Sequence, residues 1–253
     1  MTTTDSVPSD IYAIADVHGR ADLLEAMLDY ISAASHGQLS KPIIIFLGDL
    51  IDRGPHSPKV LDQVALTLSL YPGSRLILGN HDFYLRELLR DTLTDQDAAN
   101  WMDWGGVATV SAYSDSPVPD FKNIASDIRR TFPHHADLLE NALTFMEIGH
   151  YCFVHAGIRP GVLLAKQSED DLRWIRAGFL DHVEAFDHVV MHGHTITQSL
   201  RPEIYPNRIA LDTGAYRTGR LSAAVIRRGE FSHFVCTELM EAGAIQVSEW
   251  RPG

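Results

Sequence analysis

The sequence predicts an α/β fold in which two β-sheets are covered by helices and interrupted by a helical insert. Three observations lead to this prediction. Short β-rich runs alternate with helical patterns near the N-terminus, strand patterns disappear over about 83–143, and they return from about 144 onward. The chain has 253 residues, of which 45% are hydrophobic, so it can form a substantial core. We interpret residues 1–253 as a single domain.

The expected elements follow one another in the order of a βαβαβ unit. Apolar strand-like runs lie at 11–15, 43–47 and 76–78. Amphipathic helical patterns separate them, at about 21–31 and 60–70. The insert contains Trp101 and Trp104 but no convincing strand. Later strand patterns lie at 144–148, 151–154 and 188–191, and a meander expected to complete the second sheet lies at 208–211, 221–226, 231–237 and 245–249.

Composition narrows the class of protein. Lys and Arg total 21 against 33 Asp and Glu, and a net charge of -12 argues against a nucleic-acid surface. No apolar stretch is as long as a membrane span, and the first residues lack the basic and apolar regions of a signal peptide. We therefore expect a cytoplasmic protein with neither a nucleic-acid nor a membrane partner. Cys152 and Cys236 lie in apolar β-like runs, which favours buried free thiols.

Polar side chains follow five of the strand-like runs. Asp16, Asp49, Asn80, His155 and His194 each lie at or just past the end of such a run. Open α/β sheets place their ligand sites at this edge, so we expect the five residues to converge. Oxygen and imidazole ligands suit divalent metal ions. In an extended backbone, Asp16 and His18 would also point to the same side, as two ligands for one ion require.

Each motif also has an ordinary structural interpretation. Asp16 could cap the helix that follows it. The Gly-Asn-His-Asp run could be a simple turn, and Asp52 with Arg53 could form a surface ion pair. We favour the functional interpretation because the motifs occur together, each after a β run, and such a combination seldom arises by chance.

The motifs resemble those of a known family. Asp16-Val17-His18-Gly19, the run GDLIDRG at 48–54, GNHD at 79–82, HAG at 155–157 and GHT at 193–195 are similar to the pattern of calcineurin-like metallophosphoesterases. The closest resemblance is to the phosphoprotein phosphatase branch in its compact bacterial and phage form, over about 11–215. It implies two facing mixed β-sheets flanked by helices, a four-layer α/β/β/α fold, with a dinuclear metal centre between the sheets.

The resemblance assigns roles to the metal ligands. Asp16 and His18 would bind the first metal ion, and Asp49 would bridge both ions. The remaining ligands, Asn80, His155 and His194, would complete the coordination of the second ion. Manganese is the expected ion, with iron or zinc as alternatives. The wider superfamily usually has a second histidine in its last motif, and Ile196 stands in that place here. That difference indicates the phosphoprotein phosphatase arrangement.

The same resemblance assigns the catalytic residues. A metal-bridging hydroxide would attack phosphorus directly. His81 would protonate the leaving oxygen. Asp52 would orient the His81 ring and keep it charged, since a carboxylate helps an imidazole to keep its proton. Arg53 would bind phosphate oxygens, for which a planar guanidinium is well suited. A second phosphate ligand is expected in a Trp-x-Arg run, which selects Arg176 over Arg173.

Three functions are consistent with these residues. The first is a phosphoprotein phosphatase acting on phosphoserine, phosphothreonine or phosphotyrosine in a protein or peptide. The second is a symmetrical diadenosine-tetraphosphate hydrolase or another nucleotide phosphohydrolase, which Asp82 and the Leu-Asp-Thr-Gly run at 211–214 favour. Those enzymes typically lack the aspartate found here as Asp52, so we favour the phosphatase. The third is a non-enzymatic metal-binding scaffold. His192 is expected to be a buried, hydrogen-bonded residue, and surface or packing roles are expected for eight other histidines: 36, 56, 134, 135, 150, 182, 188 and 233.

Overall fold

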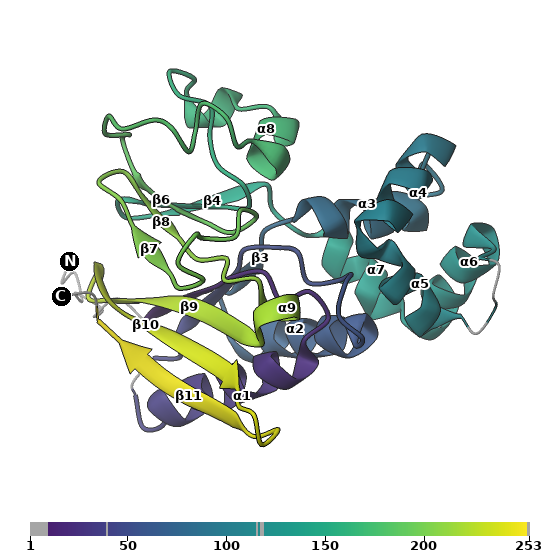
Figure 1. The fold of residues 1–253 in the computed structure, drawn as a ribbon, viewed down its shortest axis with the longest axis horizontal. Helices are drawn as coiled ribbons and strands as arrows, with labels where there is room; N and C mark the ends of the chain where they lie inside the picture. The colour runs from purple at the N-terminus through teal and green to yellow at the C-terminus, as the bar shows by residue number, and fades with distance from the viewer. Residues whose placement is uncertain (1–9, 39, 115, 117–118, 252–253) are drawn as a thin grey trace, which may run out of the picture.

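The computed structural model describes residues 10–38, 40–114, 116 and 119–251. They form two mixed β-sheets packed face to face, with a lobe of helices at one end (Figure 1). The first sheet has the strand order β11-β10-β9-β1-β2-β3. Its strands are β1 (Ile11–Ile14), β2 (Ile43–Phe46), β3 (Arg75–Leu76), β9 (Arg220–Arg227), β10 (Glu230–Leu239) and β11 (Ile245–Trp250). The second, ordered β4-β5-β6-β8-β7, contains β4 (Phe145–Ile148), β5 (Tyr151–Val154), β6 (Val189–His192), β7 (Glu203–Ile204) and β8 (Arg208–Ala210).

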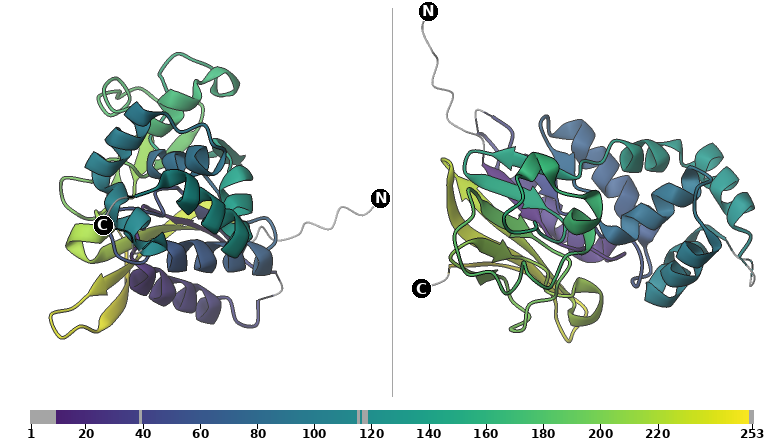
Figure 2. Two further views of the ribbon diagram at one scale, coloured as in Figure 1. Left: turned by 90° about the vertical axis from the view of Figure 1, so that its right-hand side faces the viewer. Right: turned by 90° about the horizontal axis from the view of Figure 1, so that it is seen from above.

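Helices cover the outer faces of the sheets. The helices α1 (Ala21–Ala34) and α2 (Ser57–Leu70) pack on the first sheet, and α8 (Glu169–Trp174) packs on the second. A short helix, α9 (Ala215–Thr218), precedes β9, and a 3-10 turn spans Leu164–Lys166. The lobe, which Figure 2 shows projecting from the sheets, contains α3 (Asn80–Leu89), α4 (Asp95–Trp101), a π-helical turn (Met102–Gly106), α5 (Val107–Tyr113), α6 (Phe121–Thr131) and α7 (Pro133–Glu140).

Period-two alternation of apolar side chains explains the layers. In β1, Tyr12 and Ile14 belong to the core under the helices, whereas Ile11 and Ala13 face the second sheet. The strands of the second sheet divide their side chains in the same way, between the inter-sheet core and the core under α8. The strands β1 and β5 are therefore buried on both faces. The predicted pair of facing sheets flanked by helices is confirmed.

One expectation about topology was wrong. The C-terminal meander does not form one second sheet, because only β8 joins that sheet, whereas β9, β10 and β11 extend the first. The strand β9 pairs antiparallel with β1, placing Ile226 opposite Ile11. The strand β2 hydrogen-bonds to only one edge of β1. Because β1 is buried, the backbone groups on its other edge also need a partner. That partner comes from more than 200 residues away in the chain, so local patterns do not reveal it.

Two smaller expectations can be compared directly with the structure. Cys152 and Cys236 are both buried and free, as predicted. Within the described part of the chain, no helix combines the length and the apolar character needed to cross a bilayer.

Candidate metal centre

The five residues expected at the edge of the sheets are linked by direct contacts. Asp16, Asp49, His155 and His194 lie in loops that follow β1, β2, β5 and β6, and Asn80 is the first residue of α3. The Asn80 Oδ1 atom lies 2.9 Å from Nε2 of His155 and 2.8 Å from Nδ1 of His194. His155 Nε2 is also 3.4 Å from Oδ1 of Asp49, and both oxygens of Asp16 accept the amide N–H of His194. The structure thus brings all five together.

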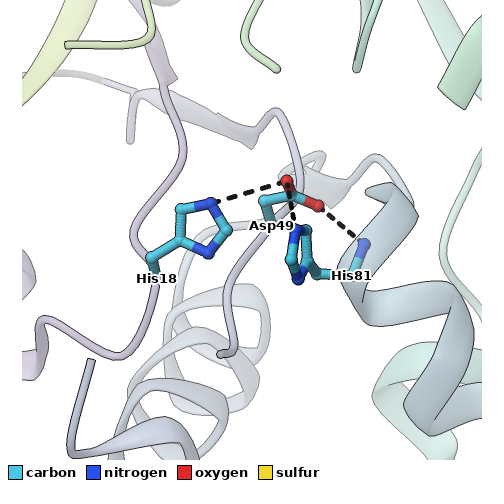
Figure 3. A group of neighbouring side chains, drawn as sticks. All are labelled: His18, Asp49 and His81. Carbon is cyan, nitrogen blue, oxygen red and sulfur yellow. Dashed lines mark hydrogen bonds and ion pairs between the residues drawn. The ribbon is translucent and has the colours of Figure 1, made fainter. Parts of the chain in front are cut away.

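Asp49 lies between two groups of potential ligands. In the first group, its Oδ2 is 3.6 Å from Nε2 of His18 and 4.0 Å from Nε2 of His81 (Figure 3). In the second group it meets His155 and His194. The donor atoms within each group lie within 4.8 Å of one another. A carboxylate shared by two groups has the placement that a bridging ligand requires.

The geometry around His18 differs from the simple alternation expected from sequence. His18 has a φ of 45°, so the loop turns here and the backbone is not extended. The first group consists of His18, Asp49 and His81 and does not include Asp16. A role for Asp16 in binding the first ion remains a prediction.

Two histidines direct their Nε2 atoms toward the centre. The Nδ1–H group of His18 donates to the carbonyl of Ile51, and that of His155 donates to the carbonyl of Leu47, each at 2.7 Å. Such a bond fixes the tautomer and leaves the lone pair on Nε2, as in metal-binding histidines generally. Both Nε2 atoms face oxygens of Asp49, and two acceptors repel each other unless a proton or a cation lies between them. The donor set therefore fits divalent cations.

The electrostatics of the site also favour cations. Burial, and then the nearby Asp212 carboxylate, raises the pKa of Asp16 well above its usual value. Burial raises the pKa of Asp212 to about 6. Burial lowers the pKa of His194 to about 2, so its imidazole is neutral and can act as a ligand. Buried, closely spaced carboxylates such as Asp16 and Asp212 are stabilised in their ionised form by nearby positive charge, which bound cations would supply.

Asp52 and His81 form a buried pair. The Asp52 Oδ2 atom is 2.6 Å from Nδ1 of His81, which directs Nε2 of the ring outward. Asp52 has 0% exposure, so the surface ion-pair interpretation does not apply. Trp101 donates from Nε1 to Asp52 Oδ2 at 2.8 Å, and Thr109 donates to Oδ1 at 2.6 Å. The helical lobe thus fixes this carboxylate.

Sequence analysis missed the contribution of Trp101 and Thr109. Neither residue belongs to a motif, and Trp101 is 49 positions from Asp52 in the chain. The one available signal was the cluster of tryptophans and glycines in the insert. The two tryptophans have different environments. Trp101 is fully buried, whereas Trp104 is 42% exposed and lines the pocket at the site.

Two arginines line this pocket. Its volume is about 240 Å³, and its walls include Arg53, Arg176, Trp104 and Trp174. The guanidinium of Arg53 donates to Nε2 of His18 at 2.8 Å and to Nε2 of His81 at 2.9 Å. The guanidinium of Arg53 therefore lies beside two histidines of the first group, where the phosphoryl oxygens would bind.

Arg173 has a different environment from Arg176. Arg173 is buried, pairs with Glu169 and Asp170, and stacks over the ring of Phe83. The structure thus places Arg176, and not Arg173, beside the pocket. The helix α8 ends at Trp174, so Arg173 lies within it and Arg176 lies in the loop that follows.

Two other residues of the motifs lie behind the pocket. Asp82 accepts the backbone N–H groups of Leu50 and Gly79, and burial raises its pKa to about 7. It holds two loops together and does not line the pocket. His192 is fully buried against Phe179, and burial lowers its pKa to about 4. Its Nδ1 atom lies 3.0 Å from the carbonyl of Gly193, in agreement with the expected buried, hydrogen-bonded role.

The glycines of the motifs are required by close backbone approach. A Cβ atom on Gly79 would lie 2.3 Å from Oδ1 of Asp49, and one on Gly193 would lie 1.9 Å from Oδ1 of Asp16. Real Cβ atoms essentially never approach other atoms so closely. These positions therefore allow the loops to bring the carboxylates into the centre.

Comparison with known proteins agrees with this geometry. A family model described as calcineurin-like phosphoesterase matches residues 9–199. The chain belongs to the calcineurin-like phosphoesterase family. The clusters of histidine and aspartate that could hold metal ions are consistent with this membership.

Individual relatives of this phosphoesterase have different names. Serine/threonine-protein phosphatase 2 of Escherichia coli (strain K12) is 28% identical over 222 residues, covering 84% of this chain and 90% of that protein. A symmetrical bis(5'-nucleosyl)-tetraphosphatase of Acidovorax ebreus (strain TPSY) is 31% identical over 106 residues, covering 37% of this chain and 35% of that protein. This second match thus spans about a third of the relative's length. The crystal structure of a candidate diadenosine tetraphosphatase superposes with a TM-score of 0.56 at 20% identity, covering 98% of this chain and 96% of that one, and shows the shared fold.

Proposed function

We propose that this phosphoesterase is a phosphomonoester hydrolase that removes phosphate from phosphoserine, phosphothreonine or phosphotyrosine in proteins or peptides. The observation that carries the proposal is the buried Asp52–His81 pair, with 2.6 Å between Oδ2 and Nδ1. A serine or threonine alkoxide is a poor leaving group and needs a proton as the bond to phosphorus breaks. A nucleoside diphosphate leaves without one. An acid held in place is therefore most useful for a monoester.

Different side chains of the protein would hold the metal ions, bind the phosphoryl oxygens and protonate the leaving group. When bound, two divalent ions would supply the nucleophile and withdraw charge from the phosphoryl oxygens. Asp49, with the ligands on either side of it, would hold the ions. Arg53 and Arg176 would bind the remaining oxygens, and Arg53 would turn from the two histidines toward them. His81, oriented by Asp52, would then donate from Nε2 to the leaving oxygen.

The relatives support this proposal unequally. The match to serine/threonine-protein phosphatase 2 covers 84% of this chain, whereas the match to the Acidovorax tetraphosphatase covers 37%. The longer match extends over most of both chains, and it therefore favours a protein phosphatase over a dinucleotide hydrolase.

A symmetrical dinucleoside-tetraphosphate hydrolase is the second candidate. Local identity reaches 37% over 162 residues for one relative of that name, from Methylococcus capsulatus (strain ATCC 33009 / NCIMB 11132 / Bath). Asp82 and the Leu-Asp-Thr-Gly run at 211–214 were the sequence features that favoured it. The Asp82 side chain, however, holds loops behind the pocket and cannot select a substrate by contact.

A parallel assay distinguishes the two candidates. The purified protein with manganese is assayed on phosphoserine, phosphothreonine and phosphotyrosine peptides and on diadenosine tetraphosphate. We expect the highest kcat/KM on a phosphopeptide. A higher kcat/KM on diadenosine tetraphosphate would replace our proposal with the second candidate.

The acid role is tested with His81→Asn. We expect kcat on a phosphoserine peptide to fall by about 10²–10⁴, the usual contribution of a general acid. On p-nitrophenyl phosphate, whose leaving group departs as the anion, the loss should be much smaller. His150→Asn, which changes a half-exposed histidine outside the pocket, is the control and should leave both rates unchanged. Equal losses on the two substrates for His81→Asn would rule out proton donation by this residue.

A further inference from the structure

A second gathering of histidines and a carboxylate lies away from the phosphoryl pocket. His134 and His135 are in the first turn of α7, and Asp62 is on α2, 72 and 73 positions away. The Oδ1 atom of Asp62 is 2.6 Å from Nε2 of His134 and 2.9 Å from Nε2 of His135. Three potential ligand atoms therefore meet at one point between two helices.

His135 is held in a fixed orientation. It has no exposed side-chain surface, and its ring stacks on Phe132 with 5.0 Å between the centroids. Its Nδ1 atom is 2.7 Å from the hydroxyl of Tyr113 on α5. Metal-binding histidines characteristically have such a partner on the nitrogen that does not bind the ion. The packing thus directs Nε2 of His135 toward Asp62.

Protonation of the cluster also suits a cation. Burial lowers the pKa of His135, although Asp62 opposes the effect, so the ring is neutral near pH 7. Burial would raise the pKa of Asp62, but hydrogen bonds from His134 and His135 outweigh it and lower this pKa. Asp62 is therefore ionised. A carboxylate and two imidazoles are a ligand set that zinc and similar ions bind.

We propose that Asp62, His134 and His135 form an additional metal site for a borderline transition-metal ion such as Zn²⁺, separate from the candidate catalytic centre. Ligands 2.0–2.1 Å from a tetrahedral ion are about 3.3 Å from one another, so the two distances from Asp62 to the histidines have to lengthen by less than ~1 Å. Asp62 and His134 have side chains that are 50% and 47% exposed, and can make this movement. The same exposure gives an ion access and leaves its fourth position to water.

The position of the site indicates what the ion would do. It would join α2, which packs on the first sheet, to α7 of the helical lobe. Tyr113, which holds His135, lies one helical turn after Thr109 on α5, and Thr109 holds Asp52. The ion would therefore stabilise the junction of the lobe with the sheets.

The test measures zinc directly in the full-length protein. Wild type, His134→Ala, Asp62→Asn and His150→Ala are stripped with a chelator, dialysed against Zn²⁺, and analysed by mass spectrometry for zinc per chain. His150 is the matched control, because its side chain is 49% exposed and faces one carboxylate at 4.0 Å. We expect one zinc ion fewer per chain in His134→Ala and Asp62→Asn than in wild type and His150→Ala.

Thermal unfolding provides a second measurement that does not depend on activity. Zinc at about 100 times its Kd should raise Tm by roughly 5–10 °C through one site in a chain of this size. We expect this increment to be missing from both cluster variants and present in His150→Ala. If His134→Ala alters the circular dichroism spectrum, Asp62→Asn, which conserves side-chain size, decides the question. Equal zinc content and equal Tm shifts in all four proteins would overturn the proposal.

Discussion

The two gatherings of histidine and aspartate in this molecule are built in different ways. At the candidate catalytic centre, loops after four strands and the start of α3 contribute the ligands, which are almost fully buried. In the cluster of Asp62, His134 and His135, two helices contribute them, and two of the three side chains are half exposed. Backbone loops can approach closely only where glycine permits it, so the first site has sequence motifs and the second has none.

The largest loss of activity is expected from a substitution of Asp49, which both groups of potential metal ligands share. Asp49→Asn should reduce bound manganese and lower activity by more than the about 10²–10⁴ expected for loss of the acid. His18→Asn, which changes one group, should lose less metal. Metal analysis by mass spectrometry makes the comparison. If Asp49→Asn retains as much metal as wild type, Asp49 does not bridge.

The two arginines near the end of α8 should differ sharply. Arg176→Ala removes a donor beside the pocket and should cost about 3–4 kcal/mol of transition-state stabilisation, with weaker inhibition by free phosphate and unchanged metal content. Arg173→Ala should leave phosphate inhibition unchanged and lower Tm, because its guanidinium is buried against Phe83 and paired with Glu169. Steady-state kinetics and thermal unfolding separate the two effects. The reverse pattern would show that Arg173 is the phosphate ligand.

A smaller effect should reveal how the lobe supports the acid. Trp101→Phe keeps the aromatic bulk but removes the hydrogen bond to Asp52, and bonds to charged groups are worth about 1.5–3 kcal/mol. We expect kcat on a phosphoserine peptide to fall by about 10- to 100-fold, with little change on p-nitrophenyl phosphate. Trp104→Phe is the control, since Trp104 lies at the pocket wall without contacting Asp52. A loss that is equal on both substrates would indicate general destabilisation of the lobe.

The smallest effect concerns the exposed cluster without its ion. Hydrogen bonds from the two histidines lower the pKa of Asp62 in the folded protein, so they stabilise the fold above the unfolded pKa of about 4 and are lost as pH falls below it. In chelator, Asp62→Asn should cost a few tenths of a kcal/mol near pH 6 and almost nothing near pH 3, because the pair is solvent-screened. Urea unfolding at the two pH values measures the difference. A constant cost would show that charge on Asp62 does not contribute.

The candidate centre could be predicted because its residues follow apolar runs. His155 comes directly after β5 and Asp49 lies in the loop just past β2, both strands being largely buried, and the glycines near them mark the turns. The same local logic could not find Trp101 and Thr109. Their contacts with Asp52 depend on how the lobe packs against the loop after β2, which no spacing in the sequence encodes.

The sequence by itself determined the family, the pair of sheets and the set of candidate ligands, because period-two alternation, strand-end polar residues and obligatory glycines are local properties of the chain. Tertiary structure decided which strands share a sheet, how the lobe holds Asp52, and how Asp62 meets His134. Adjacent positions in a helix diverge by about 100°, so His134 and His135 alone do not suggest a shared ion. Only the packing of α7 against α2 turns both rings toward one carboxylate, because long-range contacts depend on the whole fold.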